Sequence, residues 1–325
     1  MARSEPLQIR AGDVHLAATL ALPPRNPRPC PAVLMIPGLL PRDRHGRFDR
    51  VRHRTWFAPG RPPADGLFAR LAGALAHHGV ASLRYDPRGC GRSEGSWDGA
   101  GLFTRIDDAR DALAALRGHP AVDASRLGLI GLGEGGWMAL SVAAADPAVG
   151  PLTLIGTPGR GLRDVLRRGA AERARRRLQG HRHPHPFMAA FDRGLEELIE
   201  RADRGESEVG LPASRGTRLV IGLAAWEQAF RISGRALATL QARSVTLVHG
   251  GADAWVHPDE SILLADALAE RGAPWRHVVP GAGHDLAEAP DDLFPDLAAD
   301  LAARLQPRAL PTILLSLGDP PTVHP

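Results

Sequence analysis

Apolar runs alternate with amphipathic stretches along most of the chain. Short runs rich in Val, Ile and Leu, such as AVLMIPG at 32–38 and RLGLIGL at 126–132, predict buried strands. The stretch DGLFARLAGALAHH at 65–78 has one apolar face and predicts a helix. This alternation predicts βα units on a mostly parallel sheet. The runs at 7–12 and 14–23 predict an antiparallel hairpin in front of that sheet.

The same reading places the other elements of the core. Thr104 is expected to be the N-cap of the helix predicted at 104–117. Further strands are predicted at 80–86, 151–158, 244–253 and 275–284, and further helices at 104–117, 134–145, 258–271 and 291–305.

The alternation breaks between residues 159 and 242. This stretch is helical in pattern and heavily charged, and its best strand candidate is TRLVIGL at 217–223. We interpret it as a helical cap inserted between strands of one sheet. The predicted core therefore has two parts, at 1–158 and 243–306. The predicted cap spans 159–242, and a Pro-rich tail spans 307–325.

Composition narrows the class of protein. The chain has 325 residues, 44% of them hydrophobic, which suits a globular fold with a large core. It shows neither an apolar leader segment nor a stretch long enough to span a bilayer, so a soluble cytoplasmic protein is expected. All 40 basic residues are arginine and aromatics make up only 5%, which argues against nucleic-acid binding. Cys30 and Cys90 fit neither a disulfide framework nor a metal site.

The stretch IGLGEGG at 130–136 joins a predicted strand to a predicted helix. Hydrolases place their nucleophile at such a turn, in the pattern G-x-S-x-G. Here the pattern is G-L-G-E-G, and the central residue, Gly133, has no side chain to attack a substrate. Taken alone, these glycines also fit a tight βα turn.

Other predicted strand ends carry residues suited to chemistry. Asp253 lies in GADAWVHP after one strand, and His284 lies in GAGH after the next. The loop PGLLPRDRHG follows the strand at 32–36, and RYDPRGCGRSEG begins within the strand at 80–86. In open α/β sheets, ligands bind at the carboxyl ends of the strands. We therefore expect these segments to converge.

Together, these motifs resemble the α/β-hydrolases, close to the esterase and serine-aminopeptidase-like branch. In that family the turn that carries the nucleophile, called the nucleophile elbow, comes first along the chain, followed by the Asp and then the His. The turn at 130–136, Asp253 and His284 follow the same order. The resemblance implies that His284 is the general base, that Asp253 orients it, and that Gly133 stands at the nucleophile position. It also implies that the backbone amides of Leu39 and Glu134 form the oxyanion hole, with the Glu134 side chain pointing away from the pocket.

The resemblance further implies a small ester or amide ligand and no cofactor or metal. Asp43 and His45, in the first loop, are candidates for binding a substrate head group, or they only tie the loop down. Glycine tolerates the strained geometry of the elbow, so it fits a site from which catalysis has been lost.

Three hypotheses for function follow. In the first, the chain keeps a hydrolase pocket without covalent catalysis, as a pseudoenzyme or ligand-binding protein. In the second, it is an active hydrolase that uses water activated by His284 and Asp253, or another nucleophile. In the third, it is an interaction module built on the arginine-rich cap. Candidates for another nucleophile are Ser93, Ser96, Ser141 and Cys90.

Two charged motifs in the predicted cap have alternative interpretations. His181, His183 and His185 in HRHPHP can bind a transition metal, but the interleaved prolines favour a solvated loop. The arginines at 173 and 175–177 can meet an acidic substrate or partner. Such a run is more often a solvated helix face with Glu neighbours.

Overall fold

The structure is a computed structural model. It describes residues 3–24, 29–49, 66–180, 186–212, 218–241, 243–270, 272 and 274–306.

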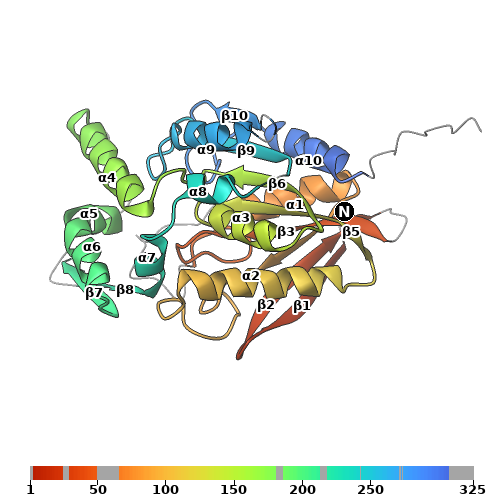
Figure 1. Ribbon diagram of the computed structural model, residues 1–325, viewed down its shortest axis with the longest axis horizontal. Helices are drawn as coiled ribbons and strands as arrows, with labels where there is room; N and C mark the ends of the chain where they lie inside the picture. Colours follow the sequence, from red (N-terminus) through yellow and green to blue (C-terminus); the bar gives the residue numbers. More distant parts are fainter. Residues whose placement is uncertain are drawn as a thin grey trace, which may run out of the picture.

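An eight-stranded sheet forms the centre of the molecule (Figure 1). Its order is β1-β2-β4-β3-β5-β6-β9-β10. β1, β2 and β4 pair antiparallel, whereas the neighbours from β4 through β3, β5, β6 and β9 to β10 pair parallel, so the predicted mostly parallel sheet with an N-terminal antiparallel hairpin is confirmed. The strands are β1 (Arg3–Ala11), β2 (Val14–Leu22), β3 (Cys30–Ile36), β4 (Ala81–Tyr85), β5 (Val122–Leu132), β6 (Val149–Ile155), β9 (Val245–Gly250) and β10 (Trp275–Val279).

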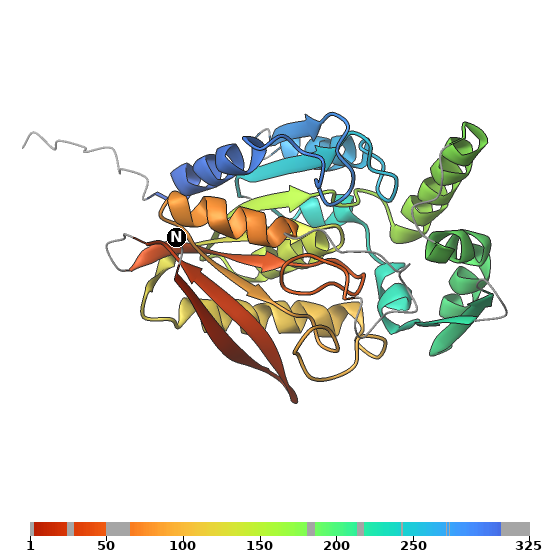
Figure 2. The ribbon, with the colours of Figure 1, turned by 180° about the vertical axis from the view of Figure 1, so that it is seen from behind.

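Helices cover both faces of this sheet. α1 and α10 share one apolar cluster on one face, and α2, α3 and α9 pack into the cluster on the other. Two views from opposite sides show this layering (Figures 1 and 2). β3 and β4 are buried along their whole length, which explains the continuous apolar sequence of β3. The helices of the core are α1 (Leu67–His77), α2 (Leu102–Arg117), α3 (Gly135–Ala145), α9 (Glu260–Ala269) and α10 (Leu293–Arg304).

A long segment leaves the sheet after β6 and returns at β9. In Figures 1 and 2, α4 to α6 and the β7–β8 hairpin lie beyond one end of the sheet, with α7 between them and the core. β8 lies within the predicted TRLVIGL run, whereas β7 was not expected. The boundaries of a separate cap remain a prediction. The elements are α4 (Leu162–Leu178), α5 (Pro186–Arg193), α6 (Leu195–Asp203), β7 (Glu208–Pro212), β8 (Arg218–Gly222), α7 (Ala224–Ala229) and α8 (Gly234–Ala238).

The start of α2 differs from the expectation. The helix begins at Leu102 with Gly101 as its N-cap, so Thr104 lies inside the first turn and is not the cap. The N–H of Phe103 donates instead to Oε1 of Gln228, a residue of α7, at 2.9 Å. A distant side chain therefore caps this helix.

Within the described residues, no helix combines the length and the apolar character needed to cross a bilayer.

Candidate active site

Four strand ends converge on one place in the molecule. Leu39 follows β3, Gly133 follows β5, Asp253 follows β9 and His284 follows β10. β3, β5, β6, β9 and β10 are consecutive neighbours and run parallel, so their carboxyl ends lie at the same edge of the sheet. The predicted convergence therefore follows from the sheet order.

Asp253 and His284 form a buried pair. His284 Nδ1 lies 2.7 Å from Asp253 Oδ2, and the Asp253 side chain is fully buried. Asp253 Oδ1 accepts hydrogen bonds from the N–H groups of Trp255, at 2.8 Å, and Val256, at 3.0 Å. These bonds fix the carboxylate, and the carboxylate in turn orients the imidazole.

Both members of this pair have displaced pKa values. Burial acts to lower the pKa of His284, but the charge of Asp253 and the hydrogen bond to it outweigh burial, so the pKa lies above the usual value of 6.5. Burial acts to raise the pKa of Asp253, but His284 and His249 outweigh it, so that pKa lies well below its usual range. The pair therefore favours a charged carboxylate beside an imidazole that readily accepts a proton.

Gly133 lies next to the imidazole of His284. Its φ is +57°, in the left-handed region that favours glycine. A Cβ atom at this residue would lie 3.2 Å from His284 Nε2. The free nitrogen of the pair thus faces the position from which a side chain of residue 133 would project.

The loop after β3 brings a backbone amide to the same place. The indole of Trp97 donates to the carbonyl of Leu39 at 3.1 Å and holds this residue in position. The N–H of Leu39 donates to Oε2 of Glu134 at 3.3 Å. The expectation that the Glu134 side chain points away from the pocket was therefore wrong. The two predicted oxyanion-hole residues contact each other through that side chain.

Two further residues of the site escaped the sequence reading. His249, near the end of β9, lies 3.5 Å from Asp253 through Nε2, and the same nitrogen lies 2.9 Å from the carbonyl of Val256. Arg42 is 3% exposed, its guanidinium stacks on Phe48, and burial lowers its pKa. His249 could have been noticed because it lies in a strand that is buried along its whole length, whereas nothing local distinguishes Arg42 from its neighbours in the loop.

The predicted substrate-binding residues Asp43 and His45 form contacts within their own loop. Asp43 accepts hydrogen bonds from the N–H groups of His45, at 2.9 Å, and Arg47, at 3.0 Å, and it pairs with the Arg47 guanidinium. The ring of His45 lies 3.5 Å from Arg84. These contacts tie the loop down, and a role in substrate binding stays a prediction.

The hydroxyls considered as replacement nucleophiles are bound to the backbone. Ser93 donates to the carbonyl of Asp86 at 2.6 Å, and Ser141 donates to the carbonyl of Trp137 at 2.8 Å. Ser96 accepts from the N–H of Gly99 at 3.1 Å. The side chain of Cys90 is buried. The three serine hydroxyls thus each bind a backbone group.

The arginine run on α4 reaches the loop that carries Asp253. Arg173 is 6% exposed, pairs with Asp192 at 2.6 Å and donates to the carbonyl of Ala254 at 2.7 Å. Arg176 donates to the carbonyl of Ala252 at 3.1 Å. The run therefore includes buried contacts as well as the expected pairs with Glu172.

The possible metal ligands His181, His183 and His185 lie outside the described residues, as does the tail from 307. In the part of the chain that is described, no group of three or more His, Cys, Asp or Glu side chains is arranged to hold a metal ion.

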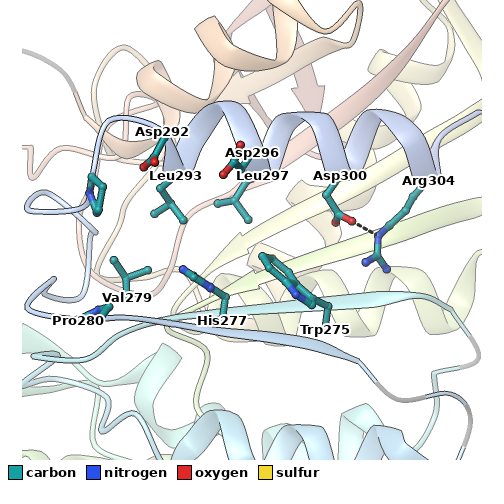
Figure 3. A pocket seen from close by; sticks show the side chains of 11 residues that line it. Trp275, His277, Val279, Pro280, Asp292, Leu293, Asp296, Leu297, Asp300 and Arg304 are labelled. Atoms are coloured by element: carbon teal, nitrogen blue, oxygen red, sulfur yellow. Dashed lines mark hydrogen bonds and ion pairs between the residues drawn. The ribbon is translucent and has the colours of Figure 1, made fainter.

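A cavity of about 440 Å³ lies away from this site, between β10 and α10. Figure 3 shows Trp275 and His277 on β10 facing Leu293 and Leu297 on α10. Neither Asp253 nor His284 lines it. The cavity is therefore separate from the chemistry gathered at the strand ends.

Comparison with known proteins identifies a family and a fold for this chain. The chain matches the family described as X-Pro dipeptidyl-peptidase (S15 family) over residues 12–202, more than half of its length. Polyketide transferase grgF of Penicillium sp. is 32% identical over 88 residues, which is 27% of this chain and 30% of that protein. The chain thus spans less than a third of that relative in the aligned region.

Comparison with solved structures confirms the predicted α/β-hydrolase fold. Est1E from Butyrivibrio proteoclasticus with bound ferulic acid has a TM-score of 0.61 at 17% identity, covering 91% of this chain and 98% of that one. The α/β-hydrolase GrgF from Penicillium sp. sh18 has a TM-score of 0.61 at 18% identity, covering 93% and 98%.

Proposed function

Because the chain belongs to the X-Pro dipeptidyl-peptidase (S15) family, we propose that it keeps the pocket of an ester or amide hydrolase without the covalent nucleophile. It acts as a non-catalytic protein that binds a small ester or amide. One observation carries this proposal: His284, oriented by Asp253, turns its free nitrogen toward residue 133, and that residue is glycine.

The argument rests on what the pair accomplishes in a serine hydrolase. A serine at the elbow gives its proton to the imidazole and attacks the carbonyl carbon, and the neighbouring carboxylate stabilises the imidazolium that forms. Without the hydroxyl, no acyl-enzyme can form. The Asp253–His284 pair and the convergent strand ends remain able to hold a ligand through hydrogen bonds.

The test is Gly133→Ser, assayed with a short-chain nitrophenyl ester. The expected result is a rise in kcat/KM of about 10²-fold or more over the parent, since a nucleophilic serine and its base act as a unit. Serine at positive φ costs about 1–3 kcal/mol, so folding is checked by circular dichroism. No gain in folded Gly133→Ser, and none in folded Gly133→Ser/Glu134→Ala, which lacks the side chain that binds the Leu39 amide, would contradict the assignment of residue 133 to the nucleophile position.

The intact pair also supports a second candidate, an active hydrolase in which His284 activates water. The raised pKa of His284 makes it a base near neutral pH. In this case the parent protein hydrolyses the ester, His284→Ala abolishes that activity, and a fluorophosphonate probe labels no serine. Labelling of the parent would point instead to another activated hydroxyl.

A further inference from the structure

The side chain of Glu134 occupies a place where a hydrolase would bind a substrate oxygen. Its Oε2 accepts the N–H of Leu39 at 3.3 Å. The same oxygen would lie 3.0 Å from a Cβ atom on Gly38, so the carboxylate sits against the backbone of residues 38 and 39. In a hydrolase of this fold, the amide at this place holds the oxygen of the reacting carbonyl.

Two basic side chains lie within electrostatic reach of this carboxylate. It acts to raise the pKa of both Arg42 and His284, which places it within electrostatic reach of the two cations. Within the described ranges, Leu39 is the hydrogen-bond donor found for its side chain. Hydrogen bonds from a backbone amide to a carboxylate are stronger than those to a neutral carbonyl.

We propose that Glu134 is a specificity-determining residue that closes the oxyanion hole to carbonyl and carboxylate oxygens. This inference rests on the proposed function and adds to it that the carbonyl of the ligand is kept away from the Leu39 amide. An ester or amide in the pocket cannot place its carbonyl oxygen on the Leu39 amide while Glu134 holds that amide. Its carbonyl therefore stays unpolarised, and the bond survives.

The contact itself can be measured in the parent background, which has Gly133. Labelling with ¹⁵N-leucine and ¹³C-carbonyl glycine selects the Gly-Leu pairs in the amide NMR spectrum, among them Gly38–Leu39, which Leu39→Val identifies by loss of its signal. Glu134→Ala should move the Leu39 amide proton upfield, because the charged acceptor is gone. Glu270→Ala, at an exposed glutamate, is the matched control and should leave the signal unmoved. An unmoved Leu39 signal in Glu134→Ala would overturn the proposal.

Catalysis gives a second readout in the Gly133→Ser background. Gly133→Ser/Glu134→Ala should exceed Gly133→Ser in kcat/KM by about 10²–10³-fold, the usual effect of one oxyanion-hole donor. Gly133→Ser/Glu134→Gln should stay close to Gly133→Ser, because the amide oxygen of Gln still accepts from Leu39. Equal activity of Gly133→Ser and Gly133→Ser/Glu134→Ala would overturn the proposal.

The two readouts separate this proposal from the one on which it rests. If the Leu39 signal moves in Glu134→Ala but neither serine variant hydrolyses the ester, Glu134 does hold the amide and the assignment of residue 133 to the nucleophile position is wrong. If both serine variants are active and equal, the elbow is right and Glu134 does not close the hole.

Discussion

The charge of His284 depends on a balance between burial and the carboxylate of Asp253. Burial alone would lower the pKa of the imidazole, and Asp253 reverses that effect. Asp253→Asn should therefore bring the pKa of His284 below 6.5. NMR titration of the His284 Cε1 proton measures the shift. Asp285→Asn, at the adjacent but more exposed carboxylate, is the control and should leave that pKa almost unmoved.

The same displacements give the pH range in which the pair stabilises the fold. The pKa of His284 is raised by folding, so its contribution is full below about pH 6.5 and is lost as pH rises through the folded pKa. The pKa of Asp253 is lowered by folding, so its contribution is present above about pH 4 and is lost as pH falls. The difference in free energy of unfolding between the parent and Asp253→Asn should therefore be largest between these values. A difference that grows above pH 7 would contradict this account.

Single residues differed in how far the sequence revealed them. Asp253 and His284 were predicted because each follows a strand and stands in a short motif whose order fits one fold. The contact between Glu134 and Leu39 was not, because it depends on how the loop after β3 lies against the turn after β5. That approach is set by tertiary packing and leaves no local pattern.

At the scale of elements, the turn from β5 into α3 controls how closely the helix approaches the sheet. A Cβ atom on Gly135 would lie 2.2 Å from the carbonyl oxygen of Ile36 and 2.7 Å from that of Pro37. These are backbone atoms at the end of β3, so they cannot rotate away. The first turn of α3 therefore fits against the loop of Leu39 only while residue 135 has no side chain.

Gly135→Ala should destabilise the protein by at least about 1–3 kcal/mol, the usual effect of overpacking. Gly73→Ala, inside α1, is the matched control because nothing lies within 4 Å of its Cβ position. It should stabilise the fold by up to about 1 kcal/mol through helix propensity. Urea unfolding of both variants gives the comparison. Equal stabilities of the two variants would show that the turn and the β3 loop are not in close contact.

Elements were predicted well where one stretch of sequence determines them and less well where a distant partner does. The run of β3 is continuously apolar because both faces of this strand are buried, and this signal is local. The start of α2 was misplaced because a first-turn N–H, that of Phe103, donates to Gln228, more than a hundred residues away in sequence. β7 was missed because five residues ending in proline carry little periodicity.

Across the whole molecule, the segment between β6 and β9 contacts the core at the loop that carries Asp253. On α4, the buried Arg173 donates to the carbonyl of Ala254, and the half-buried Arg176 donates to the carbonyl of Ala252. Arg160 and Arg168 bind the start of α9 through Glu260 and Asp259. The sequence showed the arginine run but not which of its members turn inward, because helix position alone does not say what packs opposite.

This arrangement predicts that α4 orders the Asp253 loop. Arg173→Ala removes the buried guanidinium that pairs with Asp192 and donates to the carbonyl of Ala254, which should destabilise the fold by about 1.5–3 kcal/mol. Amide hydrogen exchange in residues 252–256 should rise, and the pKa of His284 should fall toward 6.5 as Asp253 loses its fixed place. Arg176→Gln should show the same changes more weakly. Arg175→Ala is the control, since that side chain is 58% exposed and its pair with Glu172 contributes little. If Arg173→Ala and Arg176→Gln unfold more easily but leave the pKa of His284 in the folded protein unchanged, α4 stabilises the molecule without positioning the acid.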